Sequence, residues 1–497
     1  MTAKKLIALA LLGALLLTSW GTLLSCSKGG GGSASVTTAA GDAAETEPEE
    51  VDSLAARMKV SDGLENTDFE GKTFRILGDD ACLDYYLMEE ETGDVLDDSI
   101  YQRNMAVSER FNVELDAKVF PEAELTKNLK NSVMAGDNEY QLFAGHIIYA
   151  GMAVGDGIYY NWYDMPFIDF EKPWWSDSNV NDLTYKGKAF IAMGDFALTT
   201  IDSTYAMYFN KQLAADNNLG NLYQVTNEGK WTLDYLANVS KDVYRDLNGD
   251  GKAGTEDLYG FIMWARSSVN TFLYAFGEKL AKQQKDGSIV MDYYNEKVIN
   301  IYEKFIPFLW ESEGVYVDCA IPSGGNFSTM FLNDQALFYP TIFRFAGTSL
   351  REFETDYGII PYPKWDEAQD EYYTMVDGGH EGLGIPLSVS ETEFVGTIVE
   401  ALNAESWKRV VPVYYDIVLK TKGSRDEESV EMLDRIFNNR IFDFGYVYGQ
   451  WGAAFWVQYL VEAKSSDIAS YYEKNHAKYD QTMKDVFEFF EEYSLEK

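Results

Sequence analysis

Cysteine, histidine and basic residues are all scarce in this chain. Its 497 residues include three Cys and three His, and 41 Lys and Arg stand against 80 Asp and Glu, which gives a net charge of −39. Three cysteines are too few for a disulfide framework or a thiolate zinc site, and three scattered histidines argue against a histidine-rich metal site. Excess negative charge repels phosphate backbones and anionic headgroups. The composition therefore disfavours nucleic acid and phospholipid surfaces as direct partners, and leaves neutral, cationic and basic ligands open.

Apolar and aromatic residues, in contrast, are plentiful. Hydrophobic residues make up 46% of the chain, with 34 Tyr, 29 Phe and 11 Trp. A length of 497 residues leaves room for two to four compact units at roughly 100–200 residues per domain. The sequence therefore describes a globular protein with large cores.

The N-terminus has the features of a bacterial lipoprotein signal. Lys4 and Lys5 precede an unbroken apolar run at 6–17, and Leu23-Leu24-Ser25-Cys26 resembles a lipobox, in which the cysteine is diacylated. We therefore expect residues 1–25 to be a signal peptide and Cys26 to anchor the protein on the extracytoplasmic face of the cell membrane. The alternative is a plain signal peptide with an incidental cysteine. Residues 26–65, with four consecutive glycines and an acidic run, are expected to form a flexible tether.

The rest of the chain alternates between strand and helix patterns, as a parallel sheet covered by helices requires. The predicted strands are 73–78, 113–119, 140–146, 205–210, 258–263, 335–339, 357–360 and 382–385. The predicted helices are 98–111, capped by Asp98 or Ser99, 122–134, 211–217, one that begins at Thr232, 297–309, 392–402, 406–420, 428–438 and 467–493. The pattern predicts two α/β lobes, with the chain crossing between them more than once.

Several short motifs follow one another in a particular order. They are the lipobox, KPWW at 172–175 with GKAF at 187–190 and GD at 194–195, MYFNK at 207–211, WTL at 231–233 with DLNGDG at 246–251 and YG at 259–260, the stretch 330–338, and YGIIPYP at 357–363. This ordered set resembles the extracellular solute-binding proteins of ABC importers, specifically the carbohydrate-binding group called family 1. The resemblance spans most of residues 70–390, and the last hundred residues show only compatible helices.

The resemblance implies a two-lobed α/β fold of the periplasmic-binding-protein type, with a hinge and an interlobe ligand cleft. Lobe 1 would comprise 66–198 and 382–430, and lobe 2 would comprise 199–381 and 431–497, with hinge crossings near 197–202 and 377–382. It also implies a monomeric binding protein without catalytic residues, which captures a carbohydrate, and more narrowly an oligosaccharide, by lobe closure and delivers it to an ABC permease. Two alternatives stay open: an envelope-anchored enzyme that acts on glycosides with a carboxylate pair, and a non-transport receptor or adhesin of the same fold.

Aromatic residues on loops are the first candidates for contacts with a sugar, because sugars present an apolar C–H face to flat rings. Trp174 and Trp175 follow Pro173, Trp264 lies at a predicted strand end, and Trp451 lies between Gln450 and Gly452. Each could instead be a core or surface residue.

Polar residues that follow strand ends are the second set of candidates, because ligands bind at strand ends in open α/β sheets. Each could instead be a solvated loop residue. The candidates are Asp79, Asp80, Tyr85, His146, Asp195, Arg344, Asp377 and Glu381. The family often has Asp in the third strand, where this chain has Gln141, so the corresponding contact is in doubt.

A calcium-loop pattern occupies residues 246–257. Oxygen side chains stand at positions 1, 3 and 5, Gly251 stands at position 6, and a carboxylate stands at position 12, as such loops require. The ligands would be Asp246, Asn248, Asp250, the carbonyl of Lys252, and Asp257, where Glu is usual. We expect a structural calcium here, the alternative being a turn rich in Asx and Gly. Cys82 and Cys319 are expected to be free thiols in opposite lobes.

Overall fold

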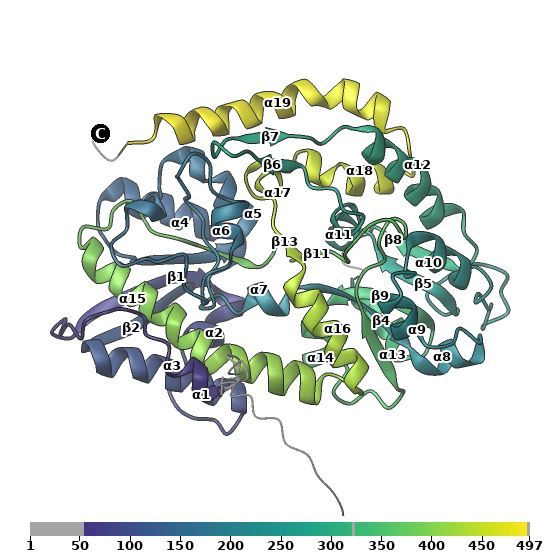
Figure 1. Ribbon diagram of the computed structural model, residues 1–497, viewed down its shortest axis with the longest axis horizontal. Coiled ribbons are helices and arrows are strands. Elements are labelled where there is room, and N and C mark those ends of the chain that lie inside the picture. Colours follow the sequence, from purple (N-terminus) through teal and green to yellow (C-terminus); the bar gives the residue numbers. More distant parts are fainter. Residues whose placement is uncertain (1–53, 321–323, 495–497) are drawn as a thin grey trace, which may run out of the picture. The chain divides into compact units, whose positions relative to one another are not determined.

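The computed structural model describes residues 54–320 and 324–494 (Figure 1). Residues from Val51 to the C-terminus form one compact unit. The predictions for the signal peptide, for Cys26 and for most of the tether lie outside the described residues. None of the helices described is long and apolar enough to cross a membrane.

The first lobe is built on a four-stranded sheet in the order β12-β3-β1-β2. β1 is parallel to β2 and β3, and β12 is antiparallel to β3. The sequence predicts this sheet because apolar residues alternate along its strands and helical periods separate them. The strands are β1 (Lys72–Asp79), β2 (Val113–Phe120), β3 (Leu142–His146) and β12 (Glu381–Gly384). The helices of this lobe are α2 (Leu83–Tyr86), α3 (Val95–Phe111), α4 (Glu122–Ala135), α5 (Ile147–Met152), α6 (Ser178–Asn181) and α15 (Thr392–Glu405).

The second lobe is built on a five-stranded sheet in the order β10-β4-β9-β5-β8. β5 is parallel to β9 and β8, whereas β4 is antiparallel to β9 and β10. The strands are β4 (Tyr205–Asn210), β5 (Tyr259–Trp264), β8 (Val315–Asp318), β9 (Ala336–Ile342) and β10 (Tyr357–Ile360). The helices are α8 (Lys211–Asp216), α9 (Leu222–Asn227), α10 (Leu233–Ser240), α11 (Ser267–Ala275), α12 (Glu296–Glu311), α13 (Gly324–Leu332), α14 (Arg344–Gly347) and α16 (Glu427–Asn438).

The chain passes between the lobes in several adjacent segments, labelled α7, β11 and β13 in Figure 1. α7 (Thr199–Asp202) leads into β4, and the segment after β11 (Thr374–Met375) leads into β12. These two segments bond to each other, since the Asp377 amide donates to the Ser203 carbonyl at 2.9 Å. β11 also pairs with β13 (Arg440–Ile441). The crossings therefore form one connected hinge.

Two helix predictions need correction. α3 begins after Asp94, whose side chain accepts the Leu96 amide, so the predicted caps Asp98 and Ser99 lie inside the helix. The helix predicted at 406–420 is π-helical in two stretches, Ser406–Val410 and Val413–Lys422. Pro412, which has no N–H to donate, lies between them. This segment continues α15 from the first lobe and contacts α14 of the second.

The C-terminal region is in contact with both lobes. It contains α17 (Phe444–Tyr448), α18 (Trp456–Glu462) and α19 (Ile468–Glu492). One part of α19 packs on α12, while Phe490 near its end packs on Phe190 at a ring separation of 4.8 Å. A hairpin of β6 (Ala281–Gln283) and β7 (Ile289–Met291) also reaches the first lobe, since the Gly287 carbonyl accepts the Lys186 amide at 2.8 Å.

Candidate ligand-binding site

A group of carboxylates lies around the C-terminal end of β1. Asp79 ends this strand and caps the following turn by accepting the Ala81 amide at 2.9 Å. The ring of Tyr86 packs closely against the strand because residue 78 is glycine: a Cβ at Gly78 would lie 2.2 Å from that ring. Burial raises the pKa of Asp79, and the neighbouring Asp80 raises it further. Burial also raises the pKa of Glu122, with contributions from the negative charges of Asp79 and Asp377.

Two further carboxylates are fixed by the hinge. The Tyr205 hydroxyl donates to Asp377 at 2.6 Å, and the Gly379 amide donates to the same carboxylate at 2.8 Å. The Thr199 hydroxyl donates to one oxygen of Glu381 at 3.2 Å. The other oxygen of Glu381 is buried without a hydrogen-bond partner in the described part of the chain. Burial, together with the charge of Asp79, holds the pKa of Glu381 well above its usual range.

His146 lies beside this group as a neutral imidazole. Its Nδ1 accepts the Ile148 amide at 3.3 Å, which leaves the proton on Nε2, 3.6 Å from Glu122. Burial lowers the pKa of His146 to about 4, although the charge of Asp377 opposes this. At neutral pH the ring therefore adds a hydrogen-bond donor and no positive charge.

An aromatic group joins the end of β3 to the loop after α17. The ring of His146 lies 4.5 Å from Tyr149 and 6.3 Å from Trp451, and Trp451 lies 4.7 Å from Phe455. Gln450 and Trp451 both have positive φ, at 50° and 58°. Bulky residues rarely adopt this left-handed conformation, and such strain is concentrated at functional sites. The fold therefore holds the Trp451 ring in a constrained position beside His146.

An ion pair between the second lobe and the hinge lies beside these carboxylates. Within the described residues, Arg344 of α14 donates to both oxygens of Asp202 at 2.9 Å. The Tyr85 hydroxyl, from α2 of the first lobe, donates to the same carboxylate at 3.1 Å. Asp202 is fully buried, whereas 45% of the Arg344 side chain is exposed. Asp202 thus links the two lobes, and part of the Arg344 side chain stays accessible to solvent.

We use the name strand-end site for the carboxylates, His146, the Trp451 group and the Arg344–Asp202 pair. The structure gathers most of the predicted site residues here: Asp79, Asp80, Tyr85, His146, Arg344, Asp377, Glu381 and Trp451. Sequence reasoning missed Glu122, Tyr149 and Asp202. Asp202 could have been found, because it is the acidic residue that lies three positions before β4, at the expected crossing.

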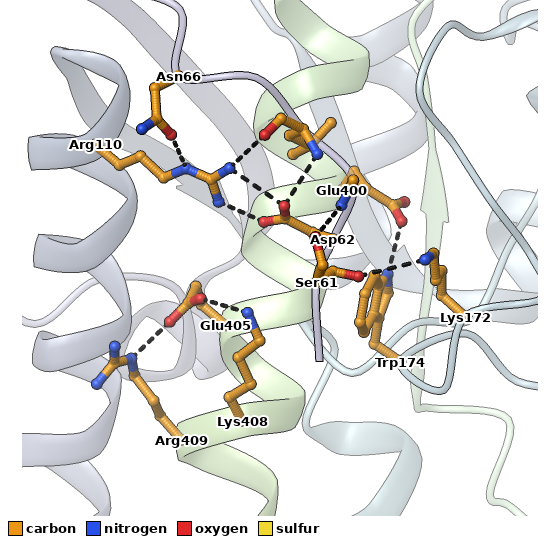
Figure 2. Close-up of polar contacts among 12 residues, drawn as sticks. Ser61, Asp62, Asn66, Arg110, Lys172, Trp174, Glu400, Glu405, Lys408 and Arg409 are labelled. Atoms are coloured by element: carbon orange, nitrogen blue, oxygen red, sulfur yellow. Dashed lines mark hydrogen bonds and ion pairs between the residues drawn. The ribbon is translucent and has the colours of Figure 1, made fainter. Parts of the chain in front are cut away.

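The remaining tryptophan candidates lie elsewhere. Trp174 and Trp175 are buried in the first lobe, and both indole N–H groups donate to Glu400 at 2.9 Å; Figure 2 shows the Trp174 bond. Trp264 ends β5 and donates to the Ala320 carbonyl at 3.1 Å. It makes no ring contact with the Trp451 group within the described ranges.

The remaining polar candidate, Asp195, also lies outside the strand-end site and lines a separate cavity at the hinge.

The predicted calcium loop is a series of tight turns closed by its own side chains. Asp246 accepts the amides of Gly249 and Gly251, at 2.7 and 2.9 Å. Asp257 is buried and accepts the Leu247 and Gly254 amides at 3.1 Å. Among the residues described, no three His, Cys, Asp or Glu side chains are grouped so as to hold a metal ion. Cys82 and Cys319 are free thiols.

Solved structures resemble this chain in fold. An ABC substrate-binding protein from Listeria monocytogenes, in complex with cycloalternan, has a TM-score of 0.54 and 10% identity, over 83% of this chain and 99% of its own. A sugar transporter structure from Rhizobium etli has a TM-score of 0.54 and 13% identity, over 85% and 100%. The GacH receptor of Streptomyces glaucescens, solved unliganded and with acarbose, has a TM-score of 0.52 and 12% identity, over 85% and 100%.

These similarities confirm the predicted fold class. The chain has the two-lobed α/β architecture of the periplasmic substrate-binding proteins. No family model matches the sequence, and no curated protein matches it.

Proposed function

We propose that the protein is the substrate-binding component of an ABC importer and that it binds a carbohydrate, most simply an oligosaccharide, at the strand-end site. The observation that carries this proposal is the strand-end site itself, where carboxylates and a strained tryptophan lie beside the hinge of a two-lobed fold. Similar folds in Listeria monocytogenes and Streptomyces glaucescens were solved with cycloalternan and acarbose, which supports the assignment.

The chemistry of the site suits a sugar with many hydroxyl groups. Asp79, Glu122 and Asp377 can accept hydrogen bonds from hydroxyls, while the exposed edge of Arg344 and the Nε2–H of His146 can donate. The indole of Trp451 offers an apolar face for the C–H surface of a pyranose ring. Because Asp202 bonds to groups from both lobes, a sugar seated here would favour one arrangement of the lobes, which an ABC permease could recognise.

A thermal-shift screen tests this function. Residues 27–497 contain the whole compact unit, and they should be screened against oligosaccharides, with peptides and polyamines as controls. A ligand at 100 times its dissociation constant stabilises the folded state by about 2.7 kcal/mol. We expect a shift with one class of glycan, and recovery of that glycan uncleaved. Recovery of cleaved glycan would support the glycoside-active enzyme, and a response to peptides or polyamines alone would refute the carbohydrate assignment.

We also propose that diacylation of Cys26 anchors the protein on the extracytoplasmic face of the membrane, with the permease as its partner. The lipobox and the polar segment after it support this proposal. In a fractionated bacterial host, Cys26→Ala should move the protein from the membrane fraction to the soluble fraction. Retention of the variant in the membrane would contradict the proposal.

Calcium at residues 246–257 is a separate proposal, supported by the spacing of Asp246, Asn248, Asp250 and Asp257 and by the φ of 75° and 70° at Gly249 and Gly251. Millimolar calcium should raise the Tm of residues 27–497 relative to the chelated protein, and Asp250→Asn should weaken the effect. An identical Tm in calcium and in chelator would exclude a structural role for the ion.

A further inference from the structure

A cavity of about 420 Å³ lies at the hinge and is lined by both lobes. Trp175 and Asp195 contribute from the first lobe, and Phe437 contributes from the end of α16. Thr200 of α7 and Arg440 of β13 belong to the crossing segments themselves, and Trp407 belongs to the π-helical stretch. None of the residues of the strand-end site lines this cavity. We call it the hinge cavity.

One guanidinium in the hinge cavity is held rigidly. Arg440 lies over the ring of Phe437 at 3.8 Å, its Nε donates to the Phe437 carbonyl at 2.9 Å, and its Nη1 donates to the Thr200 carbonyl at 2.8 Å. Its Nη2 makes no hydrogen bond to any residue that the structure describes. Burial lowers the pKa of Arg440 to about 10, so the group stays charged at neutral pH. Such a stacked guanidinium presents a fixed N–H edge, which matches the oxygens of carboxylate and phosphate groups.

A second guanidinium reaches the same cavity from α1 (Leu54–Arg57). Arg57 lies over the ring of Trp407 at 4.9 Å and donates to its carbonyl at 3.3 Å. Arg57 and Arg440 both act electrostatically on Asp195, which places the two charges around one carboxyl group. Lys172 also lines the cavity, but its ammonium donates to the Ser61 carbonyl at 3.3 Å (Figure 2).

Asp195, the acidic side chain on which both guanidinium groups act, is half-buried at the wall of this cavity. Among the described residues, none donates a hydrogen bond to the carboxylate of Asp195, and none forms an ion pair with it. Burial raises the pKa of Asp195 to about 7, although the charges of Arg440 and Arg57 oppose the shift. The other acidic residues that line the cavity are Glu171 and Asp177, and both are exposed. The positive charge of Arg440 is therefore not neutralised by direct contact.

We propose that the hinge cavity is a second binding site, which takes a small anion whose carboxylate or phosphate group is held by Arg440 and Arg57. The volume suits a molecule of the size of a sugar acid or a sugar phosphate. Asp195 then accepts a hydrogen bond from a hydroxyl of the ligand or, when protonated, donates a hydrogen bond to the anion. Because the walls come from both lobes and from the hinge, an anion bound here is thermodynamically coupled to the arrangement of the lobes, and so to the strand-end site.

Calorimetric titration of residues 27–497 tests this site. The probes are glucuronate, glucose 6-phosphate and inorganic phosphate, with glucose as the uncharged control. We expect at least one of the two sugar anions to bind ten-fold or more tightly than glucose, and to bind more tightly at pH 6 than at pH 8, since Asp195 loses its proton around pH 7. The stronger of the two sugar anions identifies the group as carboxylate or phosphate. Binding of inorganic phosphate alone, or of no anion, would overturn the proposal.

Substitutions of single arginines test whether the anion binds in the hinge cavity. Arg440→Gln and Arg57→Gln should each weaken anion binding at least ten-fold, whereas Arg435→Gln, on α16 but outside the cavity, should not. If Arg440→Gln does not fold, Arg57→Gln decides, because that side chain is on the periphery. Unchanged binding in Arg57→Gln, or loss of binding in Trp451→Ala, would place the anion elsewhere and refute the proposal. Oligosaccharide binding is measured on the same proteins. Loss of anion binding in the hinge cavity can then be distinguished from loss of sugar binding at the strand-end site.

Discussion

Replacing Trp451 by alanine should weaken oligosaccharide binding about 30-fold or more, while the protein remains folded. Tryptophans that dominate an interface typically contribute about 2 kcal/mol or more, which corresponds to this factor. Trp451 is only partly buried, and it makes ring contacts with His146, Tyr149 and Phe455. Calorimetric titration with the glycan identified by the thermal screen measures the loss.

Two companion variants make this result specific. Trp365→Ala removes another partly buried tryptophan, which packs against Phe276 and Lys304 in the second lobe, and should leave sugar affinity unchanged. Trp451→Gly should bind as weakly as Trp451→Ala, yet be more stable by about 1 kcal/mol, because glycine adopts the φ of 58° without strain. Sugar affinity in Trp451→Ala within three-fold of the parent would remove this ring from the site.

Replacing Glu400 by alanine should cost about 2–6 kcal/mol of unfolding free energy. Its two oxygens each accept one indole N–H at 2.9 Å, from Trp174 and Trp175, and Glu400 is fully buried. The change leaves two buried donors without partners, at about 1–3 kcal/mol each. Glu400→Gln should cost less, because the amide oxygen still accepts one indole. Urea unfolding measures both losses, and Glu393→Gln, exposed on the same helix, is the matched control.

The ionisation of Glu400 should make the free energy of unfolding depend on pH. Burial raises the pKa of Glu400 to about 7, against the opposing effect of the two indole hydrogen bonds. A carboxyl group whose pKa is higher in the folded state contributes stability that is complete below the unfolded pKa of about 4.5 and is lost as the pH rises through about 7. The parent should therefore lose stability between pH 5 and pH 8 more steeply than Glu400→Gln. Equal slopes, or a loss below 1 kcal/mol in Glu400→Ala, would contradict this account.

The local parts of the fold could be predicted because each depends on neighbouring residues. Alternation in 113–119 predicts β2, the helical period of 122–134 predicts α4, and Thr232 caps α10 by accepting the Tyr235 amide as expected. β8 was missed, because Val315–Asp318 is only four residues long and the pattern of a strand is weak over so short a stretch.

Residues of the candidate site that follow strand ends could be predicted from the sequence. Contacts between residues that are far apart in the sequence could not. Asp79 and His146 follow strands that the pattern reveals, so their proximity follows from the parallel sheet. The paired tryptophans at 174 and 175 look equally suited to a sugar, but their partner Glu400 lies more than 220 residues away in the sequence. No local pattern encodes that bond, nor the left-handed conformation of Trp451.

The most direct test of the central claim is hydrogen–deuterium exchange of residues 27–497, with and without the glycan that gives the largest thermal shift. Ligand at the strand-end site should slow exchange at 79–86, 146–149, 199–205, 377–381 and 449–455, with the glycan recovered intact. Protection confined to the hinge-cavity segments 171–178 and 437–442, or to neither set, would contradict the assignment of the sugar to the strand-end site.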